Sequence, residues 1–320
     1  MTSETALITA LRGLADTPGA RGLMDDAAVL EIGGKKLVLT LDTVVESVHF
    51  LPNDPPQDVA WKLVAVNVSD LAAKSATPLG CLYSHALGDD AWDRAFLDGL
   101  GEACAHFAMP LLGGDTVRMP QDAPRSFSLT ALGKGPTGAT PVPSRLGAKP
   151  GDRVWVSGTI GDAGLGLAVL TGQQRASGEA RDALIAAYRR PAPDVALGLA
   201  LAPLVHAMMD VSDGVLVDAG RMASASGCAL AIAADTVPLS PHLCEVLGDT
   251  LDTRLAAMTA GDDFRLLFTA PPECTAHIHE IAASLGCPVS AIGGVSAGAG
   301  LTLVHKGEPL PLPERLGYEH

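Results

Sequence analysis

Residues 61–80 read WKLVAVNVSDLAAKSATPLG, and this stretch decides the fold. Its apolar side chains recur on nearly every side of a helix, which is typical of a helix that is buried all round. Pro78 predicts where that helix ends. Asn67, Ser69 and Asp70 nevertheless lie in its middle, and a buried ionised carboxylate is costly unless a cation or several donors meet it. Asp70 is therefore either a satisfied buried hydrogen-bonding group or part of a ligand site.

The composition limits the fold and the function. A chain of 320 residues, 48% of them hydrophobic, is long enough for two packed domains. Aromatic residues make up only 4%, which argues against stacking surfaces for single-stranded nucleic acid. The formal net charge of -14 argues against a polyanion-binding surface and suits a protein that recruits divalent cations. We therefore expect no nucleic-acid partner.

The sequence shows no membrane or export signal. No apolar run reaches the roughly 20 residues that a transmembrane helix needs. The N-terminal stretch MTSETALITALRGLA lacks the basic start and the long apolar core of a signal peptide. The six cysteines form no CxxC pair, so zinc and redox motifs are not indicated. These patterns predict a cytoplasmic protein with reduced thiols and no membrane partner.

A hairpin precedes the central helix. Residues 27–32 and 36–41 read as two strands joined at Gly33 and Gly34. Elsewhere, apolar spacing of three to four predicts helices, and alternation or a short apolar run predicts strands. The expected helices cover about 5–14, 61–76, 91–107, 163–170, 194–201, 215–224, 241–247 and 276–285, and the expected strands 79–87, 127–132, 153–157, 228–233 and 289–293.

Residues 133–152, GKGPTGATPVPSRLGAKPGD, are the best candidate for a domain boundary. Glycine and proline dominate this segment, and it has no periodicity. The regions on both sides mix strands with helices, so we expect an α+β protein. The two expected domains cover 1–140 and 150–320.

Acidic turns are the most informative feature of the sequence. They lie beside small residues, which let a ligand approach the backbone. Mg2+ prefers oxygen ligands, and several dispersed aspartates suit a site with more than one Mg2+ on a nucleoside triphosphate. Aspartate also favours turns and helix caps for purely structural reasons, so no single one decides the question. The acidic turns are Asp25-Asp26, Asp42, Asp70, Asp115, Asp210, Asp213 and Asp262-Asp263, of which Asp70 and Asp210 lie inside apolar segments.

The motifs of the chain resemble a known family. Neither a Walker A sequence nor a kinase glycine-rich loop with its lysine is present. From about Gly22 to the last residues, the chain is instead similar to the thiamine-monophosphate kinase family. That family is grouped with aminoimidazole ribonucleotide synthetases, selenophosphate synthetases and a hydrogenase maturation protein. LDTVVESVHF and the C-terminal GYEH look specific to the kinases. The segments in common are MDDAAV, TLDTVVESVHF, AVNVSDLAAKSATP, LLGGDTVR, GAKPGD, SGTIGDAGLGLAVL, MDVSDGVLVD and AGDDFRLLFTAP.

The resemblance implies a fold and a reaction. The fold would have an α/β N-terminal domain whose strands pair with a second subunit in a homodimer, an α+β C-terminal domain, and ATP in the groove between them. The reaction would be phosphorylation of thiamine monophosphate to thiamine diphosphate by direct in-line transfer from ATP, with several Mg2+ ions. One alternative is another ATP-dependent synthetase or phosphotransferase of the same superfamily, like aminoimidazole ribonucleotide synthetase or selenophosphate synthetase. Another is a non-catalytic, ATP-sensing dimer.

The resemblance also implies roles for numbered residues. Met24 stands where the family has glycine, and Asp262 where it has glutamate, which shortens the reach toward the substrate by one methylene. His49 by itself could equally end a strand. The implied metal ligands are Asp25, Thr40, the main chain at Leu41, Asp42, Asp70, Asp115, Asp210 and Asp213, and of these Asp42, Asp115, Asp210 and Asp213 would be catalytic. The implied ATP contacts are Gly114, Asp115, Arg145 and Ser212, and the implied thiamine contacts are His49, Asp262 and Tyr318.

Overall fold

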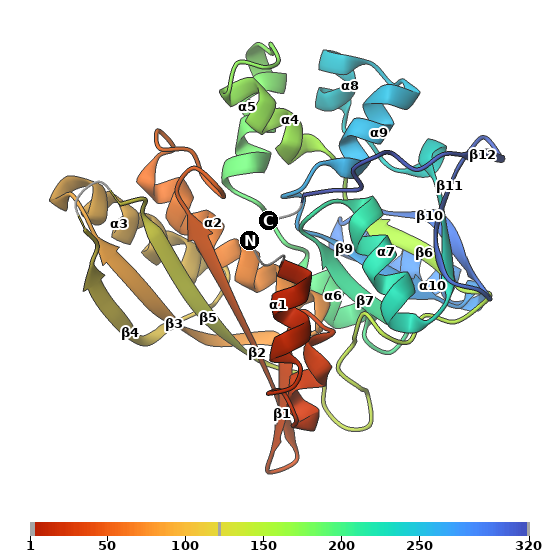
Figure 1. Ribbon diagram of the computed structural model, residues 1–320, viewed down its shortest axis with the longest axis horizontal. Helices are drawn as coiled ribbons and strands as arrows, with labels where there is room; N and C mark the ends of the chain where they lie inside the picture. The colour runs from red at the N-terminus through yellow and green to blue at the C-terminus, as the bar shows by residue number, and fades with distance from the viewer. Residues whose placement is uncertain (1–3, 121–122, 319–320) are drawn as a thin grey trace.

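The computed structural model describes residues 4–120 and 123–318. It has two sheets, each with its own helices, lying side by side (Figure 1). The α+β fold expected from the sequence is confirmed. The strands are β1 (Ala28–Ile32), β2 (Lys35–Val45), β3 (Thr77–Leu87), β4 (Leu111–Arg118), β5 (Ser126–Lys134), β6 (Arg153–Ser157), β7 (Ala207–Val211), β8 (Ala229–Ala233), β9 (Arg265–Ala270), β10 (Val289–Ser296), β11 (Gly300–His305) and β12 (Glu308–Leu310). The α-helices are α1 (Glu4–Leu11), α2 (Pro56–Ala73), α3 (Asp90–His106), α4 (Asp162–Leu170), α5 (Gly178–Arg189), α6 (Val195–Leu201), α7 (Val215–Ser226), α8 (Pro241–Leu247), α9 (Leu251–Thr259) and α10 (Thr275–Leu285), and short 3-10 helices are η1 (Pro18–Leu23), η2 (Ala234–Thr236) and η3 (Pro272–Cys274).

The first sheet has the strand order β1-β2-β5-β3-β4. The expected hairpin is confirmed, with Leu30 of β1 opposite Leu37 of β2. β4 was not expected, because its sequence LLGGDTVR has two adjacent glycines, which weaken strand propensity. It pairs in parallel with β3 and forms the edge of the sheet. Tertiary pairing therefore decided a strand that local propensity did not indicate.

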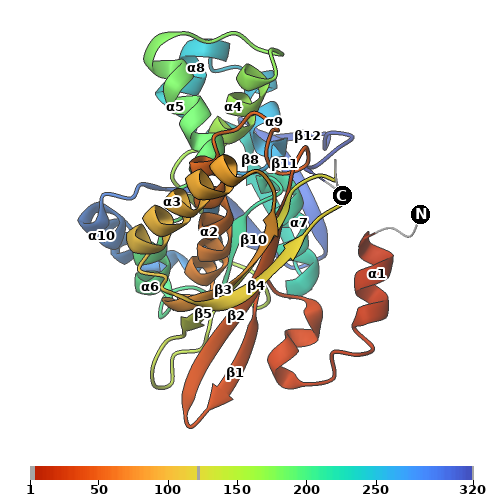
Figure 2. The ribbon, with the colours of Figure 1, turned by 90° about the vertical axis from the view of Figure 1, so that its left-hand side faces the viewer.

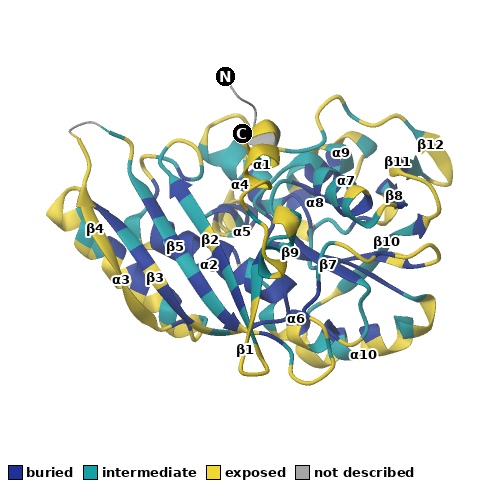
Figure 3. Ribbon diagram, turned by 60° about the horizontal axis from the view of Figure 1, so that its bottom comes forward, coloured by how far each residue is buried: buried dark blue, intermediate teal, exposed yellow. Residues whose placement is uncertain are grey.

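One face of the first sheet is covered and the other is exposed. Helices α2 and α3 run side by side along the covered face, where Val38 and Phe127 are buried (Figure 2). On the opposite face, Leu30, Leu41 and Leu82 are 41%, 61% and 46% exposed. The edge strand β4 is exposed along its whole length (Figure 3). An apolar sheet face of this kind favours a further interaction partner.

The central helix α2 is buried because both domains pack against it. It begins at Pro56 rather than at Trp61, and proline suits the first turn of a helix. Leu63 lies in the core of the first domain, and Ala72 lies in a second core shared with α6, β7 and β9. Gly198 of α6 permits this approach, since a Cβ there would lie 2.1 Å from the carbonyl oxygen of Ala72. The expectation of a helix buried all round is confirmed.

The second sheet has the strand order β12-β11-β8-β10-β6-β9-β7. All five residues of β7 are buried, so the aspartate in this strand, Asp210, is enclosed by the core. The sequence did not predict β7, β9, β11 and β12 or the helices α5 and α9. In α5 the buried Ala180, Leu184 and Tyr188 are spaced four residues apart, so the periodicity of this segment does indicate a helix. β11 and β12 are short and glycine-rich at their ends, and local propensity is weak there.

The segment between the sheets is anchored to both domains. Arg21 donates to the carbonyl oxygens of Val142 and Pro143 at 3.0 and 2.9 Å. Ser226 Oγ donates to the carbonyl oxygen of Arg145 at 3.1 Å. The two sheets cover 28–134 and 153–310, and the domain division at 1–140 and 150–320 stays a prediction. The segment is therefore positioned to supply site residues as well as to connect the domains.

Two sequence expectations concern the membrane and the thiols. None of the described helices is long and apolar enough to cross a membrane. All six cysteines are free thiols.

Candidate active site

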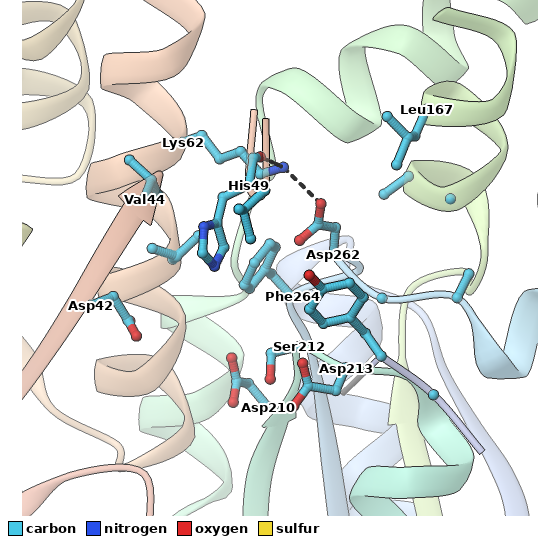
Figure 4. A pocket seen from close by; sticks show the side chains of 18 of the residues that line it. Asp42, Val44, His49, Lys62, Leu167, Asp210, Ser212, Asp213, Asp262 and Phe264 are labelled. Carbon is cyan, nitrogen blue, oxygen red and sulfur yellow. Dashed lines mark hydrogen bonds and ion pairs between the residues drawn. The ribbon is translucent and has the colours of Figure 1, made fainter. Parts of the chain in front are cut away.

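A pocket of about 580 Å³ lies between the two domains (Figure 4). Its walls come from β2 and α2 of the first domain. The second domain adds α4, the turn that follows β7, the turn that precedes β9, and the C-terminal tail. Segments far apart in the sequence therefore converge on one cavity. The predicted site residues that line it are Asp42, His49, Asp70, Asp210, Ser212, Asp213, Asp262 and Tyr318.

The polar residues in the middle of α2 connect this helix to the acidic strands. Ser69 Oγ donates to Asp210 Oδ2 at 2.7 Å, across the contact between the domains. Thr40 Oγ1 donates to Asp70 Oδ2. Both hydrogen bonds orient a carboxylate at the floor of the pocket. Asp70 therefore accepts a hydrogen bond, as expected of a purely structural residue, and it also lines the pocket, as expected of a ligand-site residue.

The carboxylates of Asp42, Asp70 and Asp210 lie close together, the first two half-buried and the third buried, and we call them the open carboxylates. Burial raises the pKa of Asp42 to about 6 and that of Asp210 to about 8, and neighbouring carboxylates add to both increases. Burial is also the main cause that raises the pKa of Asp70 well above its usual range, and the charges of Asp42 and Asp210 raise it further. Across the described ranges, none of the three forms an ion pair with a lysine or an arginine. When these carboxylates are ionised, no cationic side chain of the described residues neutralises them.

The turn after β7 presents Asp213 to the same region. Gly214 has φ of 121°, a conformation that favours glycine, and it directs the chain from β7 into α7. Asp213 pairs with Arg221, which also lies 2.9 Å from Asp218 Oδ1. The N-cap residue of α7 is Gly214, which has no side chain, so no side-chain hydrogen bond caps the start of this helix. Neither Asp210 nor Asp213 therefore caps this helix, and the capping alternative is wrong.

Asp25 and Asp26 lie beside the open carboxylates but are already paired with cations. Lys74 Nζ lies 2.5 Å from Asp25 Oδ1 and 2.6 Å from Asp26 Oδ2. Arg21 pairs with Asp25, and Arg145 pairs with Asp26. Burial by itself would raise the pKa of Asp25, but Lys74 and the hydrogen bonds around the carboxylate lower it to about 2. Arg145, an expected ATP contact, is outside the pocket lining and held by Asp26.

Six predicted site residues do not line the pocket: Asp25, Thr40, Leu41, Gly114, Asp115 and Arg145. The side chain of Leu41 lies on the exposed face of the first sheet. Asp115 of β4 is paired with Ser84 of β3 and belongs to the same exposed face. Three strand spacings separate β4 from β2, or about 14 Å at the usual strand distance. Within one chain, Asp115 is therefore remote from Asp42.

The opposite end of the pocket is formed around Lys62. Its Nζ lies 2.7 Å from Asp262 Oδ2, donates to the carbonyl oxygen of His49 at 2.9 Å, and lies 3.9 Å from the ring centre of Tyr188. The Lys62 side chain is 3% exposed and that of Asp262 is 30% exposed, so the lysine is shielded from water while the carboxylate stays accessible. His49 Nδ1 accepts a hydrogen bond from the N–H of Val45 at 3.1 Å. His49 therefore ends a strand and lines the pocket as well.

Tyr318 reaches the pocket because the C-terminal tail crosses the turn after β7. Its N–H donates to the carbonyl oxygen of Asp213 at 2.9 Å. Gly317 allows this close approach, since a Cβ there would lie 2.4 Å from the same oxygen. The last two residues of the expected GYEH marker, 319 and 320, lie outside the described residues.

The sequence interpretation missed Lys62 and Lys74. Both belong to the stretch 61–80, and both are buried in the structure. A lysine is almost never fully buried unless it is paired. Two lysines in an otherwise apolar helix that already contained Asp70 were therefore a usable signal for buried ion pairs.

The open carboxylates fit a divalent cation, whereas Asp25 does not. Buried carboxylates with raised pKa values are stabilised when a cation binds their ionised form. Within the described ranges, no group of three or more His, Cys, Asp or Glu side chains is already arranged as a metal site. A metal ion would therefore require rotation of these side chains. The oxygens of Asp25 are occupied by Lys74 and Arg21.

Family models match both domains of the chain. The model described as AIR synthase related protein, N-terminal domain, matches residues 24–134. The model described as AIR synthase related protein, C-terminal domain, matches residues 149–306. The two sheets and the acidic pocket between them are thus those of an AIR synthase related protein.

Individual relatives narrow this class. Thiamine-monophosphate kinase of Caulobacter vibrioides is 40% identical over 312 residues, which cover 95% of this chain and 86% of that protein. The solved structure described as AaThiL complexed with AMPPCP and TMP is 30% identical, with a TM-score of 0.84, and the match covers 99% of this chain and 97% of that one. A crystal structure of thiamine-monophosphate kinase from Stenotrophomonas maltophilia is 36% identical, with a TM-score of 0.78 and coverage of 95% and 96%. The chain belongs to the thiamine-monophosphate kinase family.

Proposed function

We propose that this chain transfers the γ-phosphoryl group of ATP directly and in line to thiamine monophosphate, giving thiamine diphosphate. The observation that carries the proposal is the set of three open carboxylates facing a pocket that has an acidic residue, Asp262, at its other end. Family membership supports the same reaction, since the relative AaThiL was solved in complex with AMPPCP and TMP.

Phosphoryl transfer requires positioning and charge neutralisation rather than covalent chemistry by the protein. Mg2+ bound at the open carboxylates would neutralise the phosphate charge of ATP and align the transferred group. Ser69 and Thr40 hold two of these carboxylates in fixed orientations. Ser212 and Asp213, on the turn after β7, face the same part of the pocket; the Ser212 hydroxyl is suited to donate to a phosphate oxygen, whereas the Asp213 carboxylate would act through a bound cation. Contacts of ATP with Arg145 and Gly114 stay predictions.

Asp262 supplies the charge that suits the acceptor. Its carboxylate would face the cationic thiazolium ring, and His49 and Tyr318 line the same pocket. Lys62 fixes the position of this carboxylate through the 2.7 Å contact. The ring would then lie at the Lys62 end, with the phosphate of the acceptor directed toward the open carboxylates.

Product analysis tests the proposed reaction. The purified protein is incubated with ATP, Mg2+ and either thiamine monophosphate or other small phosphoacceptors. We expect thiamine diphosphate and ADP in equal amounts, and no product from the other acceptors. Phosphorylation of a different acceptor, or ATP-dependent formation of another bond, would instead favour a different ATP-dependent synthetase or phosphotransferase of the same superfamily.

We further propose a homodimer built on the exposed face of the first sheet. This face carries the exposed Leu30, Leu41 and Leu82. Asp115 belongs to the same face, so a second copy packed there would meet it. In this dimer Asp115 would lie near the pocket of the partner subunit, whereas it is remote from the pocket of its own chain. A cytoplasmic location, where thiols stay reduced, belongs to the same proposal.

A further inference from the structure

Lys74 directly follows α2 and is enclosed on all sides, with 0% exposure. Its Nζ donates to Asp25 Oδ1 at 2.5 Å and to the carbonyl oxygen of Met208 at 3.1 Å, and it forms an ion pair with Asp26 Oδ2 at 2.6 Å. Two of the three ammonium donors are therefore used in hydrogen bonds, and the positive charge is shared by two carboxylates. The acceptors come from the segment before β1 and from β7, so this cation connects the two domains.

The charges around the acidic cluster divide it into two parts. Asp25 and Asp26 share three cationic groups, those of Lys74, Arg21 and Arg145. The open carboxylates share none among the described residues. Positive charge is thus supplied by the chain in one part and is missing in the other.

We propose that Lys74 is a built-in cation for Asp25 and Asp26, so that this pair takes no divalent cation and Mg2+ enters at the open carboxylates instead. The family resemblance implied a metal ligand at Asp25, and the geometry points to an ammonium group there instead.

Displacement of Lys74 by Mg2+ would be costly. The ion would have to expel an ammonium group whose side chain is fully enclosed, and a buried charge without partners is strongly destabilising. Mg2+ also keeps several of its water ligands, and the 1% exposed side chain of Asp25 leaves little space for them. Because Lys74 is covalently part of the chain, the Asp25 segment stays in place before any metal binds.

This inference rests on the proposed function for the identity of the metal, but its test measures metal binding alone. Mn2+, as the probe, is titrated by electron paramagnetic resonance of the free ion, with and without AMPPCP. The variants are Asp25→Asn, Asp210→Asn and Lys74→Met. Lys62→Met is the matched control, because it removes another buried lysine, within α2 itself, that is paired with a different aspartate, Asp262.

We expect wild type and Asp25→Asn to bind the same number of Mn2+ ions with affinities within a few-fold. Asp210→Asn should weaken binding by at least about tenfold. Lys74→Met should gain one further Mn2+ ion, and Lys74→Met combined with Asp25→Asn should lose it again. Lys62→Met should leave the number of bound ions unchanged.

A lower Mn2+ count in Asp25→Asn would overturn the inference, as would an unchanged count in Lys74→Met or no binding by wild type. If Lys74→Met does not fold, the Asp25→Asn comparison in the otherwise native chain still decides. The two proposals fail separately. Loss of an ion in Asp25→Asn with thiamine diphosphate still formed would refute only the role of Lys74, and the expected Mn2+ pattern without thiamine diphosphate would refute only the proposed reaction.

Discussion

Ser69 in α2 of the first domain and Asp210 in β7 of the second are joined by a buried hydrogen bond of 2.7 Å. Their exposed fractions are 0% and 5%. Asp210 lies beside Asp42 and Asp70, which belong to the first domain, so this bond sets how closely the acidic groups of the two domains approach. The site is therefore as much a property of the domain contact as of either domain.

Asp210→Asn should lower Mg2+-dependent turnover by at least about a hundredfold, since a metal-bound charge contributes several kcal/mol to the transition state. The melting temperature of the metal-free protein should stay the same or rise, because the substitution removes one of several repelling carboxylates. Both quantities are measured on the same preparation. Asp98→Asn, at an exposed carboxylate of α3, is the control and should change neither. A clear loss of stability with normal turnover would refute the metal-binding role.

Asp213→Asn separates a catalytic carboxylate from a structural ion pair. We expect a loss of turnover of at least about a hundredfold and little change in stability, because the pair with Arg221 is partly exposed and Arg221 keeps Asp218 as a partner. The opposite pattern, a stability loss of about 1 kcal/mol with turnover per folded molecule near wild type, would mean that Asp213 acts only through Arg221.

The metal-free protein should lose stability as the pH rises from 5 to 8.5. The folded-state pKa of Asp210 is about 8 against an ordinary value of 3.8, so in this interval the folded state holds a proton that the unfolded state has released. The free energy of unfolding therefore falls with pH. Mg2+, which binds the ionised form, should reduce that decrease.

Thermal unfolding across this pH range, with Mg2+ and with a chelator, checks the prediction. Asp210→Asn should show a shallower decrease than wild type in the chelator. Equal slopes would show that Asp210 is not the titrating group. Asp25 has the opposite sign, because its folded pKa of about 2 is below the ordinary 3.8. Its contribution to stability is present above about pH 4 and lost toward pH 2.

Asp262→Ala should raise KM for thiamine monophosphate while KM for ATP stays within a few-fold, because Asp262 lies at the pocket end away from the open carboxylates. Asp262→Glu should be tolerated or should improve binding, because it restores the longer reach of the family. Since Lys62 positions Asp262, Lys62→Met should affect the same KM, and the double variant should be less than additive. Equal weakening of both substrates would contradict this assignment.

Local patterns in the sequence were sufficient for the elements that carry most of the site. The apolar run of α2 predicted a buried helix, and burial made Asp70 conspicuous before any fold was known. Asp210 was conspicuous because it lies inside an apolar segment, although the strand β7 itself was not predicted. The apolar runs and turns around these residues are local, and local patterns are what a single sequence displays.

Tertiary relationships were not predictable in the same way. Lys74 and Asp25 are 49 positions apart, and only the packing of α2 against the segment before β1 makes them partners. The position of Asp115 depends on strand order, because β4 lies at the far edge of the sheet from β2. Strand order follows from non-local pairing, so no motif in GGDT indicated that this aspartate points away from its own pocket.

The proposed homodimer leads to a complementation test of Asp115. If Asp115 acts in the pocket of the partner, then Asp115→Asn and Asp42→Asn should each abolish most activity as homodimers. A heterodimer of the two variants keeps one pocket with both native carboxylates, so it should regain about half of the wild-type turnover. Heterodimers are isolated by tandem affinity tags after coexpression, and their mass is checked by light scattering.

The control pair is Asp42→Asn with Asp210→Asn. These two aspartates line the pocket of the same chain, so every pocket of their heterodimer lacks one of them and no activity should return. Rescue in the first pair and not in the control would establish that the site is shared between subunits. A monomer at micromolar concentration would contradict the homodimer itself. A stable dimer without rescue would instead confine Asp115 to the exposed sheet face and remove it from the catalytic residues.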